Sequence, residues 1–361
     1  MTALRGTLPA TRIRSLAMPA AVAAIIATIA GILLLLAVAS GPPAPEPTVA
    51  EGSGDLAMYA RLVDRLRGGE DYYAAAHAEL LAGDFGTRSV FNWRTPAYFS
   101  LMALAPSLMW AQAGLALLAL AAAAAALLLF RRTGGDGFAL LLAPFLLLGM
   151  TSVIVPTAVL LPEVTAGFLI LLSVAAYGLG RPGIGLTAGA AALVVRELAA
   201  PYALICAWLA WRQGRTREVA GWVAVFVGYS AIFGWHASRV AATLGPADRA
   251  YPEGWLQLGG LDFILATAAF NGTWGVLPVW ATAIALPLSL LGLAAWLGPG
   301  GTRATLTVAA YLVLFSAFGK PFNYYWGAMY TPLLALGMPW AIAAIFGLGE
   351  RVRPAANANG T

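Results

Sequence analysis

Ionisable residues stand inside or beside long apolar stretches of this 361-residue chain at Glu163, at the adjacent Arg196 and Glu197, and at Lys320. Ionisable groups in apolar surroundings cost free energy and usually mark function, so these residues are candidates for a site. Carboxylates can accept a proton and cationic side chains can hold an anion, which are the two chemistries that this set offers. Lys320 is the only lysine of the chain. An alternative interpretation is that it anchors the chain at a membrane interface, as lysines beside aromatic residues often do.

The partners of Arg196 and Glu197 can be anticipated from helix geometry. Adjacent positions on a helix point about 100° apart, so we expect these two side chains not to pair with each other. Each side chain then needs another partner, and Glu163 is the candidate for Arg196.

The elements that position these residues follow from composition. The chain is 60% hydrophobic and 10% charged, whereas about 25% of the residues of an average soluble domain are charged. A soluble globular protein and a disordered chain are therefore excluded, and the length of the apolar runs argues against an outer-membrane barrel. The fold class that remains is all-α, a polytopic helical membrane protein.

The apolar runs predict about ten transmembrane helices, because one span needs about 20 residues. The predicted spans lie at 18–39, 106–130, 138–154, 157–178, 183–195, 198–211, 219–234, 273–297, 305–318 and 331–346. The expected organisation is one integral-membrane domain over 1–361, with a first outer loop at 40–105 and a short cytoplasmic tail at 350–361.

The charge distribution predicts the orientation of the chain in the membrane. If the N-terminus is cytoplasmic, 12 basic residues fall in short inner segments, as the positive-inside rule expects. They are Arg5, Arg12, Arg14, Arg131, Arg132, Arg181, Arg212, Arg215, Arg217, Arg303, Arg351 and Arg353. An even number of spans then places both termini in the cytoplasm, with the chain in the inner (plasma) membrane. Basic residues are nowhere clustered with aromatic ones, so nucleic-acid binding has no support.

The first outer loop has the pattern of two helices. From Asp55, apolar residues recur at helical spacing with charged residues opposite, which predicts an amphipathic helix on the membrane surface. Asp55 follows a Gly-Ser-Gly sequence and is suited to be the N-cap of this helix. A second helix is expected at about 71–82, after Gly68-Gly69.

The order of these elements and several local motifs resemble the integral-membrane glycosyltransferases of the GT-C superfamily. The motifs are Gly54-Asp55-x3-Tyr59-x3-Val63-x2-Leu66-x2-Gly69-x2-Tyr72-Tyr73, Asn92-Trp93-Arg94-Thr95-Pro96, Arg196-Glu197-Leu198 with Trp222, and Lys320-x3-Tyr324-Tyr325. The resemblance implies transfer of a sugar from a polyprenyl-phosphate donor to a lipid or glycan acceptor on the outer side of the membrane, with inversion.

The resemblance also implies a catalytic base in the first outer loop, and Asp55 matches that position. The alternatives are that Asp55 only caps its helix, that it does both, or that Asp71 or Glu163 is the base. Arg94, Arg196 and Lys320 fall on the outer side and could hold the phosphate. The residues expected to bind substrate are Tyr59, Arg94, Glu163, Arg196, Glu197, Lys320, Tyr324 and Tyr325.

The same interpretation sets a geometric expectation: Asp55, Glu163, Arg196 and Lys320 should line one outward-facing cavity. No metal ion and no other cofactor is expected, because the sequence contains no Asp-x-Asp or Glu-x-Asp motif. The histidines His77 and His236 are interpreted as packing or surface residues.

Two other classes of protein remain as alternatives. The first is a polytopic transporter or lipid flippase, for which internal repeats and polar groups at mid-membrane would be typical. The sequence shows no clear repeat between its halves, and eight of the 16 acidic residues lie in the first outer loop. The second alternative is a non-catalytic membrane scaffold, which would not need ionisable pairs between spans.

Overall fold

The computed structural model describes residue 32 and residues 54–250, 257–270 and 277–345. Of the expected first span at 18–39 only Ile32 is described, and the expected tail at 350–361 lies outside the described residues. Within the described ranges the regular secondary structure is helical, apart from one isolated bridge between Gln257 and Phe318. The prediction of an all-α fold is confirmed.

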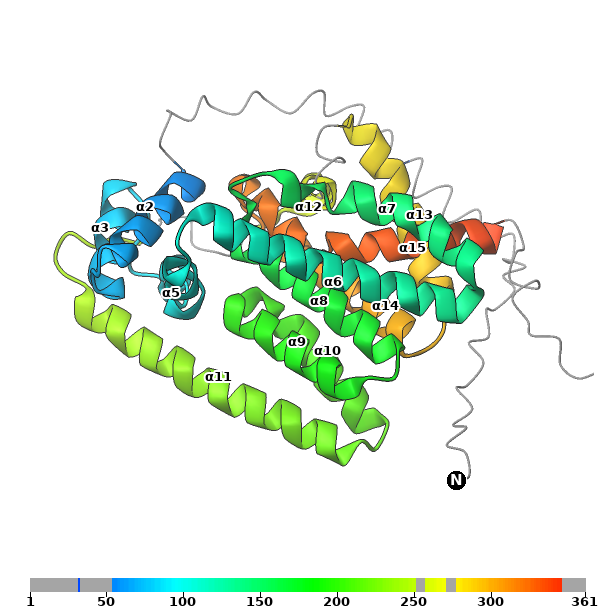
Figure 1. The fold of residues 1–361 in the computed structure, drawn as a ribbon. Coiled ribbons are helices and arrows are strands. Elements are labelled where there is room, and N and C mark those ends of the chain that lie inside the picture. Colours follow the sequence, from blue (N-terminus) through cyan, green and yellow to red (C-terminus); the bar gives the residue numbers. More distant parts are fainter. Residues whose placement is uncertain (1–31, 33–53, 251–256, 271–276, 346–361) are drawn as a thin grey trace, which may run out of the picture.

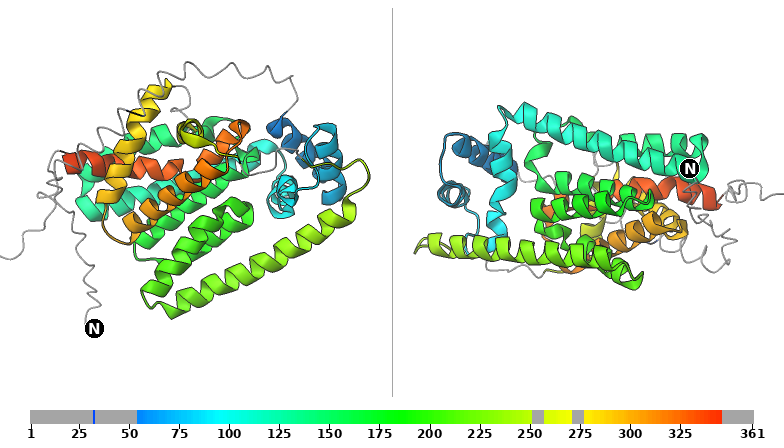
Figure 2. Two further views of the ribbon diagram at one scale, coloured as in Figure 1. Left: turned by 180° about the vertical axis from the view of Figure 1, so that it is seen from behind. Right: turned by 60° about the horizontal axis from the view of Figure 1, so that its bottom comes forward.

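The outer loop forms a group of short helices at one end of the molecule (Figures 1 and 2). They are α2 (Asp55–Arg67), α3 (Tyr72–Ala82), α4 (Val90–Trp93) and α5 (Pro96–Leu104). The two helices expected in this loop are therefore present. Arg61 and Arg65 of α2 hold Glu79 of α3 at 2.6 and 2.7 Å, so charged residues join the two helices while their apolar faces are buried.

The remaining helices form a bundle that extends away from this group (Figure 1). They are α6 (Leu108–Gly134), α7 (Asp136–Gly149), η1 (Thr151–Ile154), η2 (Ala158–Leu160), α8 (Pro162–Gly178), α9 (Pro182–Val195), η3 (Glu197–Ala199), α10 (Ala200–Arg212), α11 (Thr216–Thr243), α12 (Gly260–Ala269), α13 (Val279–Ala295), α14 (Pro299–Ala317), η5 (Pro321–Met329) and α15 (Thr331–Ile345). Helix α11 runs along the side of the bundle, and its C-terminal end lies beside α3 (Figure 1).

The lengths of these helices differ from the even pattern of spans that the sequence predicts. Two described helices, α6 and α11, are by themselves long and apolar enough to cross a membrane. A bent pair, Phe322–Met329 with Thr331–Ile345, passes the same test when its 58° bend is taken as a break within one span. Several shorter apolar helices complete the bundle. One of them, α12, lies where the sequence pattern predicts only an outer segment, and it packs against η5 and α14.

The segment η5 is positioned by close backbone contacts at two glycines. A Cβ on Gly167 of α8 would lie 1.9 Å from the carbonyl oxygen of Ala328, and a Cβ on Gly327 would lie 1.8 Å from that of Thr267. Only glycine permits backbones to approach this closely. The contacts fix η5 against α8 and α12, and thereby fix the polar residues near its beginning.

Candidate functional site

A small pocket lies between α2 and η5, two elements that are far apart in the sequence. Its lining includes five of the residues singled out from the sequence: Asp55, Tyr59, Arg94, Lys320 and Tyr325. The other lining residues are Met58, Leu80, Phe85, Asn92, Phe322 and Asn323. The cavity volume is about 30 Å³, which is enough for a water molecule or two. A carboxylate and two cationic side chains thus face the same space.

The Asp55 carboxylate faces η5 and does not cap its own helix. Gly54 occupies the N-cap position with a φ of 88°, and Asp55 is the first residue of α2. The hydroxyl of Tyr325 donates a hydrogen bond to Asp55 Oδ2 over 2.6 Å. The prediction that Asp55 is an N-cap is therefore wrong, because the glycine that precedes it takes that position.

Asp71, the alternative base in the same loop, is the residue that caps a helix. Its Oδ1 accepts hydrogen bonds from the backbone N–H groups of Tyr73 at 3.0 Å and Ala74 at 3.2 Å, at the beginning of α3. A carboxylate engaged in this way already has two donors. The structure therefore favours Asp55 over Asp71 as the carboxylate that is available to a substrate.

Arg94 is held in an unusual backbone conformation at the edge of the pocket. Its φ of 59° and ψ of 167° lie in a region that residues with a side chain rarely adopt, and such strain is often found at functional sites. Its Nε donates to the hydroxyl of Tyr59 over 3.0 Å, and its Nη1 donates to the carbonyl oxygen of Phe91. Within the described ranges no carboxylate forms an ion pair with Arg94. Its guanidinium group is therefore held in place by neutral hydrogen-bond acceptors.

Burial has a direct consequence for the hydroxyl of Tyr59. Burial raises the pKa of Tyr59 far above its ordinary value, although the nearby Arg94 acts in the opposite direction. The hydroxyl therefore keeps its proton at neutral pH. It accepts from Arg94 and retains a proton that it can donate to a ligand in the pocket.

Lys320 lies at the start of η5 with only 4% of its surface exposed. Its Nζ is 5.9 Å from the centre of the Phe322 ring. An interface anchor would extend its ammonium group into water, so the burial of this side chain in the pocket wall favours a role in the pocket.

The buried ion-pair network of Glu163, Arg196 and Glu197 does not line the pocket. Arg196 Nε donates to Glu163 Oε1 over 2.7 Å, and Arg196 Nη1 donates to Glu197 Oε1. Pairing of Arg196 with Glu163 is therefore confirmed. The prediction that Arg196 and Glu197 do not pair is wrong, because the chain leaves the helical conformation at Arg196, where φ is −152° and ψ is 120°.

The expectation that Asp55, Glu163, Arg196 and Lys320 line one cavity holds for only two of the four. Asp55 and Lys320 line the pocket, whereas the buried Arg196 forms ion pairs with the carboxylates of Glu163 and Glu197. Tyr324 also lies outside the lining, with 36% of its surface exposed and its ring 5.6 Å from that of Phe270. A buried guanidinium needs compensating charge within the protein, which is why Arg196 lies within its ion-pair network and not at the pocket wall.

Two asparagines of the lining were not anticipated from the sequence. Asn92 donates from its amide to the carbonyl oxygen of Gly86 over 2.6 Å, whereas Nδ2 of Asn323 is buried and has no hydrogen-bond partner among the described residues. Asn323 is a polar residue between Lys320 and the tyrosine pair, and this position is the signal that could have indicated it.

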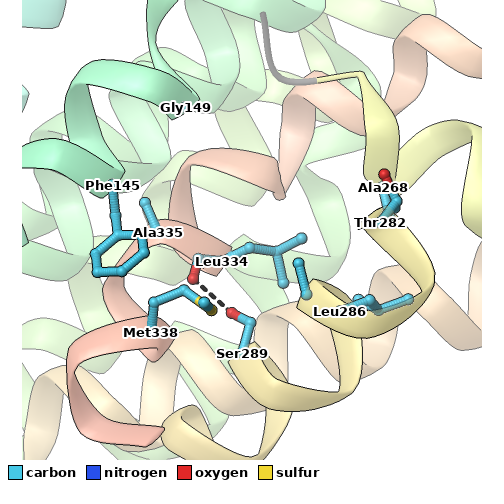
Figure 3. Close-up of a pocket in the computed structure, with 10 residues that line it drawn as sticks. Phe145, Gly149, Ala268, Thr282, Leu286, Ser289, Leu334, Ala335 and Met338 are labelled. Atoms are coloured by element: carbon cyan, nitrogen blue, oxygen red, sulfur yellow. Dashed lines mark hydrogen bonds between the residues drawn. The ribbon is translucent and has the colours of Figure 1, made fainter. Parts of the chain in front are cut away.

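A second pocket lies within the bundle, between α7, α12, α13 and α15 (Figure 3). Its volume is about 20 Å³ and its lining residues are Phe145, Gly149, Ala268, Thr282, Ala285, Leu286, Ser289, Leu334, Ala335 and Met338. Ser289 Oγ donates to the carbonyl oxygen of Leu334, so this hydroxyl is already engaged (Figure 3). The described lining has no titratable side chain, whereas the pocket at Asp55 is lined by one carboxylate and two cationic side chains.

Taken together, the helical bundle, the group of short helices at one end and the charged pocket between them define an all-α polytopic membrane protein. Its sequence matches no protein-family model and no curated protein.

Among solved structures, the fold is similar to that of ArnT from Cupriavidus metallidurans in the apo state, with a TM-score of 0.51. The two sequences are 16% identical, and the match covers 90% of this chain and 59% of ArnT. The chain thus spans about three fifths of the length of this structural neighbour. At this level of identity, the similarity concerns the fold.

Proposed function

We propose that this protein is a membrane glycosyltransferase that moves a sugar from a polyprenyl-phosphate donor to a lipid or glycan acceptor on the outer side of the membrane. The observation that carries the proposal is the pocket in which the Asp55 carboxylate faces Arg94 and Lys320. A proton acceptor beside two cations suits a reaction that takes a proton from one group and leaves negative charge on another. The GT-C fold supports the same class of reaction.

In the proposed reaction, Asp55 is the general base. Its free carboxylate oxygen takes the proton from the acceptor hydroxyl, whose oxygen forms a bond to the anomeric carbon of the sugar. The bond between that carbon and the phosphate oxygen breaks, and the electron pair leaves with the polyprenyl phosphate. Direct displacement on the face opposite to the leaving group inverts the anomeric configuration.

The remaining pocket residues have separate roles in this proposal. Arg94 and Lys320 stabilise the phosphate as its charge grows, since buried cations act more strongly than cations in water. Tyr325 orients the carboxylate of Asp55 through its 2.6 Å hydrogen bond, and Tyr59 orients Arg94. The network of Glu163, Arg196 and Glu197 supports the site without contacting the substrate. Tyr324 lies outside the pocket and contacts a part of the donor that extends beyond it.

The test is the substitution Asp55→Asn in purified protein, with transfer measured from a panel of polyprenyl-phosphate pentoses and hexoses. Asparagine keeps the size of the side chain and removes its basicity, so we expect a loss of turnover of at least about 100-fold, within the usual range for a general base. The matched control is Asp64→Asn on the same helix, where the side chain is 73% exposed and pairs with Arg67. Thermal unfolding of both variants should resemble that of the wild type.

Each outcome of this test bears on the proposal. Unchanged transfer by folded Asp55→Asn protein would exclude Asp55 as the base. If the wild type transfers no sugar but moves a solute or a lipid across vesicles, the protein is a transporter or flippase and the proposed function is wrong.

A further inference from the structure

The side-chain amide of Asn323 is a buried polar group that the reaction proposed above does not use. Only 3% of the residue is exposed, and it lines the pocket between Lys320 and Tyr325. Its backbone N–H donates to the carbonyl oxygen of Lys320 over 2.8 Å, which ties the residue to the start of η5. Its Nδ2 has no hydrogen-bond partner among the described residues.

The oxygen of this amide is only weakly engaged. Tyr325 carries one hydroxyl proton, and two acceptors lie near it: Asp55 Oδ2 at 2.6 Å and Asn323 Oδ1 at 3.4 Å. One proton serves the nearer acceptor, which is also the charged one. The amide of Asn323 therefore offers the pocket one donor and one acceptor, in whichever of its two orientations it is placed.

A buried amide without good partners destabilises the empty protein. A ligand that satisfies both of its groups recovers this free energy, and a ligand that lacks one of the matching groups does not. The position of the amide therefore creates selectivity for a ligand with a hydrogen-bond donor and a hydrogen-bond acceptor side by side.

On the basis of the proposed function, we propose that Asn323 binds two adjacent hydroxyl groups of the transferred sugar. One hydroxyl donates to the amide oxygen and its neighbour accepts from the amide nitrogen. The amide lines the same pocket as Asp55, which faces the attacking hydroxyl, and Lys320, which holds the phosphate. Both the attacking hydroxyl and the phosphate act at the anomeric carbon, so the recognised pair is the hydroxyls on C2 and C3, the two ring carbons that follow the anomeric carbon.

The experiment compares donors that differ by one hydroxyl. A donor that the wild type uses is taken from the panel of polyprenyl-phosphate sugars, and its 2-deoxy and 3-deoxy forms are prepared. We expect the wild type to lose about tenfold or more in kcat/KM with either deoxy donor, since a lost hydrogen bond of about 1.4 kcal/mol corresponds to a tenfold change. Asn323→Ala should lose a similar factor with the parent donor and show little further loss with the deoxy donors.

The matched control is Asn92→Ala, because Asn92 lines the same pocket and its amide is already bound to the carbonyl oxygen of Gly86. This variant should keep the full wild-type penalty for both deoxy donors. Asn323→Ser serves as a second variant if Asn323→Ala does not fold.

The outcomes separate this inference from the proposed function. Equal deoxy penalties in the wild type and in folded Asn323 variants would overturn the role of Asn323 and leave the glycosyltransferase intact. If the wild type transfers no sugar from any donor, the proposed function fails and the role of Asn323 fails with it.

Discussion

The hydroxyl of Tyr325 donates a hydrogen bond to the carboxylate of Asp55 over 2.6 Å, across 270 positions of the sequence. This contact joins the first helix of the outer loop to the segment that precedes α15. It fixes one oxygen of a carboxylate that lines the pocket. The two residues therefore act together in the proposed reaction, Asp55 as base and Tyr325 as the residue that positions it.

The first prediction concerns this hydrogen bond. Tyr325→Phe keeps the ring and removes the donor, and a hydrogen bond to a charged group contributes about 1.5–3 kcal/mol. We expect kcat to fall by about tenfold or more while KM for the donor changes little, because the variant misplaces the base and keeps the cations. Steady-state kinetics on purified protein measure both. Tyr229→Phe on α11 is the control, since Tyr229 does not line the pocket and its hydroxyl has no hydrogen-bond partner among the described residues. A selective rise in KM would instead assign Tyr325 to substrate binding.

The second prediction concerns the buried pair of Glu163 and Arg196. Both side chains are almost fully buried, with exposures of 0% and 2%. Arg196→Met leaves the Glu163 carboxylate without its cation, and breaking a buried pair destabilises by about 3–5 kcal/mol. We expect a large decrease in the unfolding temperature of Arg196→Met.

A double variant separates loss of charge balance from loss of packing. Replacing both residues, as Glu163→Gln with Arg196→Met, removes the fully buried unpaired charge at Glu163 and should restore part of the lost stability, while Glu197, whose side chain is 14% exposed, keeps contact with water. Chemical unfolding in detergent compares the single and double variants. If the double variant is less stable than Arg196→Met, the pair does not behave as a compensated charge pair.

The third prediction rests on a clamp that joins α3 to the loop after α11. His77 Nε2 lies 2.8 Å from Asp248 Oδ1, and the backbone N–H of Gly245 donates to Asp248 Oδ2. The backbone N–H of Thr87 donates to the carbonyl oxygen of Arg249 over 2.9 Å. These contacts hold the C-terminal end of α11 against the helices of the outer loop.

The stabilising effect of this clamp depends on pH through Asp248. Burial by itself would raise the pKa of Asp248, but hydrogen bonds from Gly245, Thr87 and His77 lower it below the ordinary value of 3.8. A carboxyl whose pKa is lowered by folding stabilises the folded state above its unfolded pKa, and the effect is lost as the pH falls through the folded pKa. We expect the stabilisation to be complete above about pH 4 and to disappear below it.

Thermal unfolding of the wild type and of Asp248→Asn between pH 3 and pH 6 measures this effect. The difference in unfolding temperature between the two proteins should be largest at pH 5–6 and should narrow as the pH approaches 3. A difference that stays constant over this range would show that the charge of Asp248 does not contribute.

The fourth prediction concerns the orientation of the chain. Cys206 is the only cysteine, and it is fully buried, so Cys206→Ala provides a background for labelling. Ala74→Cys places an exposed thiol on α3 in the outer loop, and Gln213→Cys places one in the turn between α10 and α11. With both termini cytoplasmic, a membrane-impermeant maleimide should label Ala74→Cys in intact cells and Gln213→Cys only after permeabilisation. The opposite pattern would invert the proposed topology.

Composition and apolar periodicity by themselves determined the fold class and the existence of most helices. The scarcity of charge and the length of the apolar runs require helices that satisfy their own backbone hydrogen bonds in a membrane. The amphipathic pattern after Asp55 determined α2, since its buried residues recur at helical spacing. These features are local, which is why the sequence is sufficient to predict them.

Tertiary structure alone decided which charged residues meet. The sequence pattern indicated Asp55, Arg94 and Lys320 separately, but only the close contacts of η5 with α8 and α12 bring Lys320 and Tyr325 to Asp55. Tertiary structure also turned Arg196 toward two carboxylates. The backbone leaves the helical conformation at Arg196, and a buried guanidinium is stabilised by the carboxylates nearest to it. Pairing between distant segments depends on packing that no local pattern encodes, so the pocket and the amide of Asn323 become visible only in the folded chain.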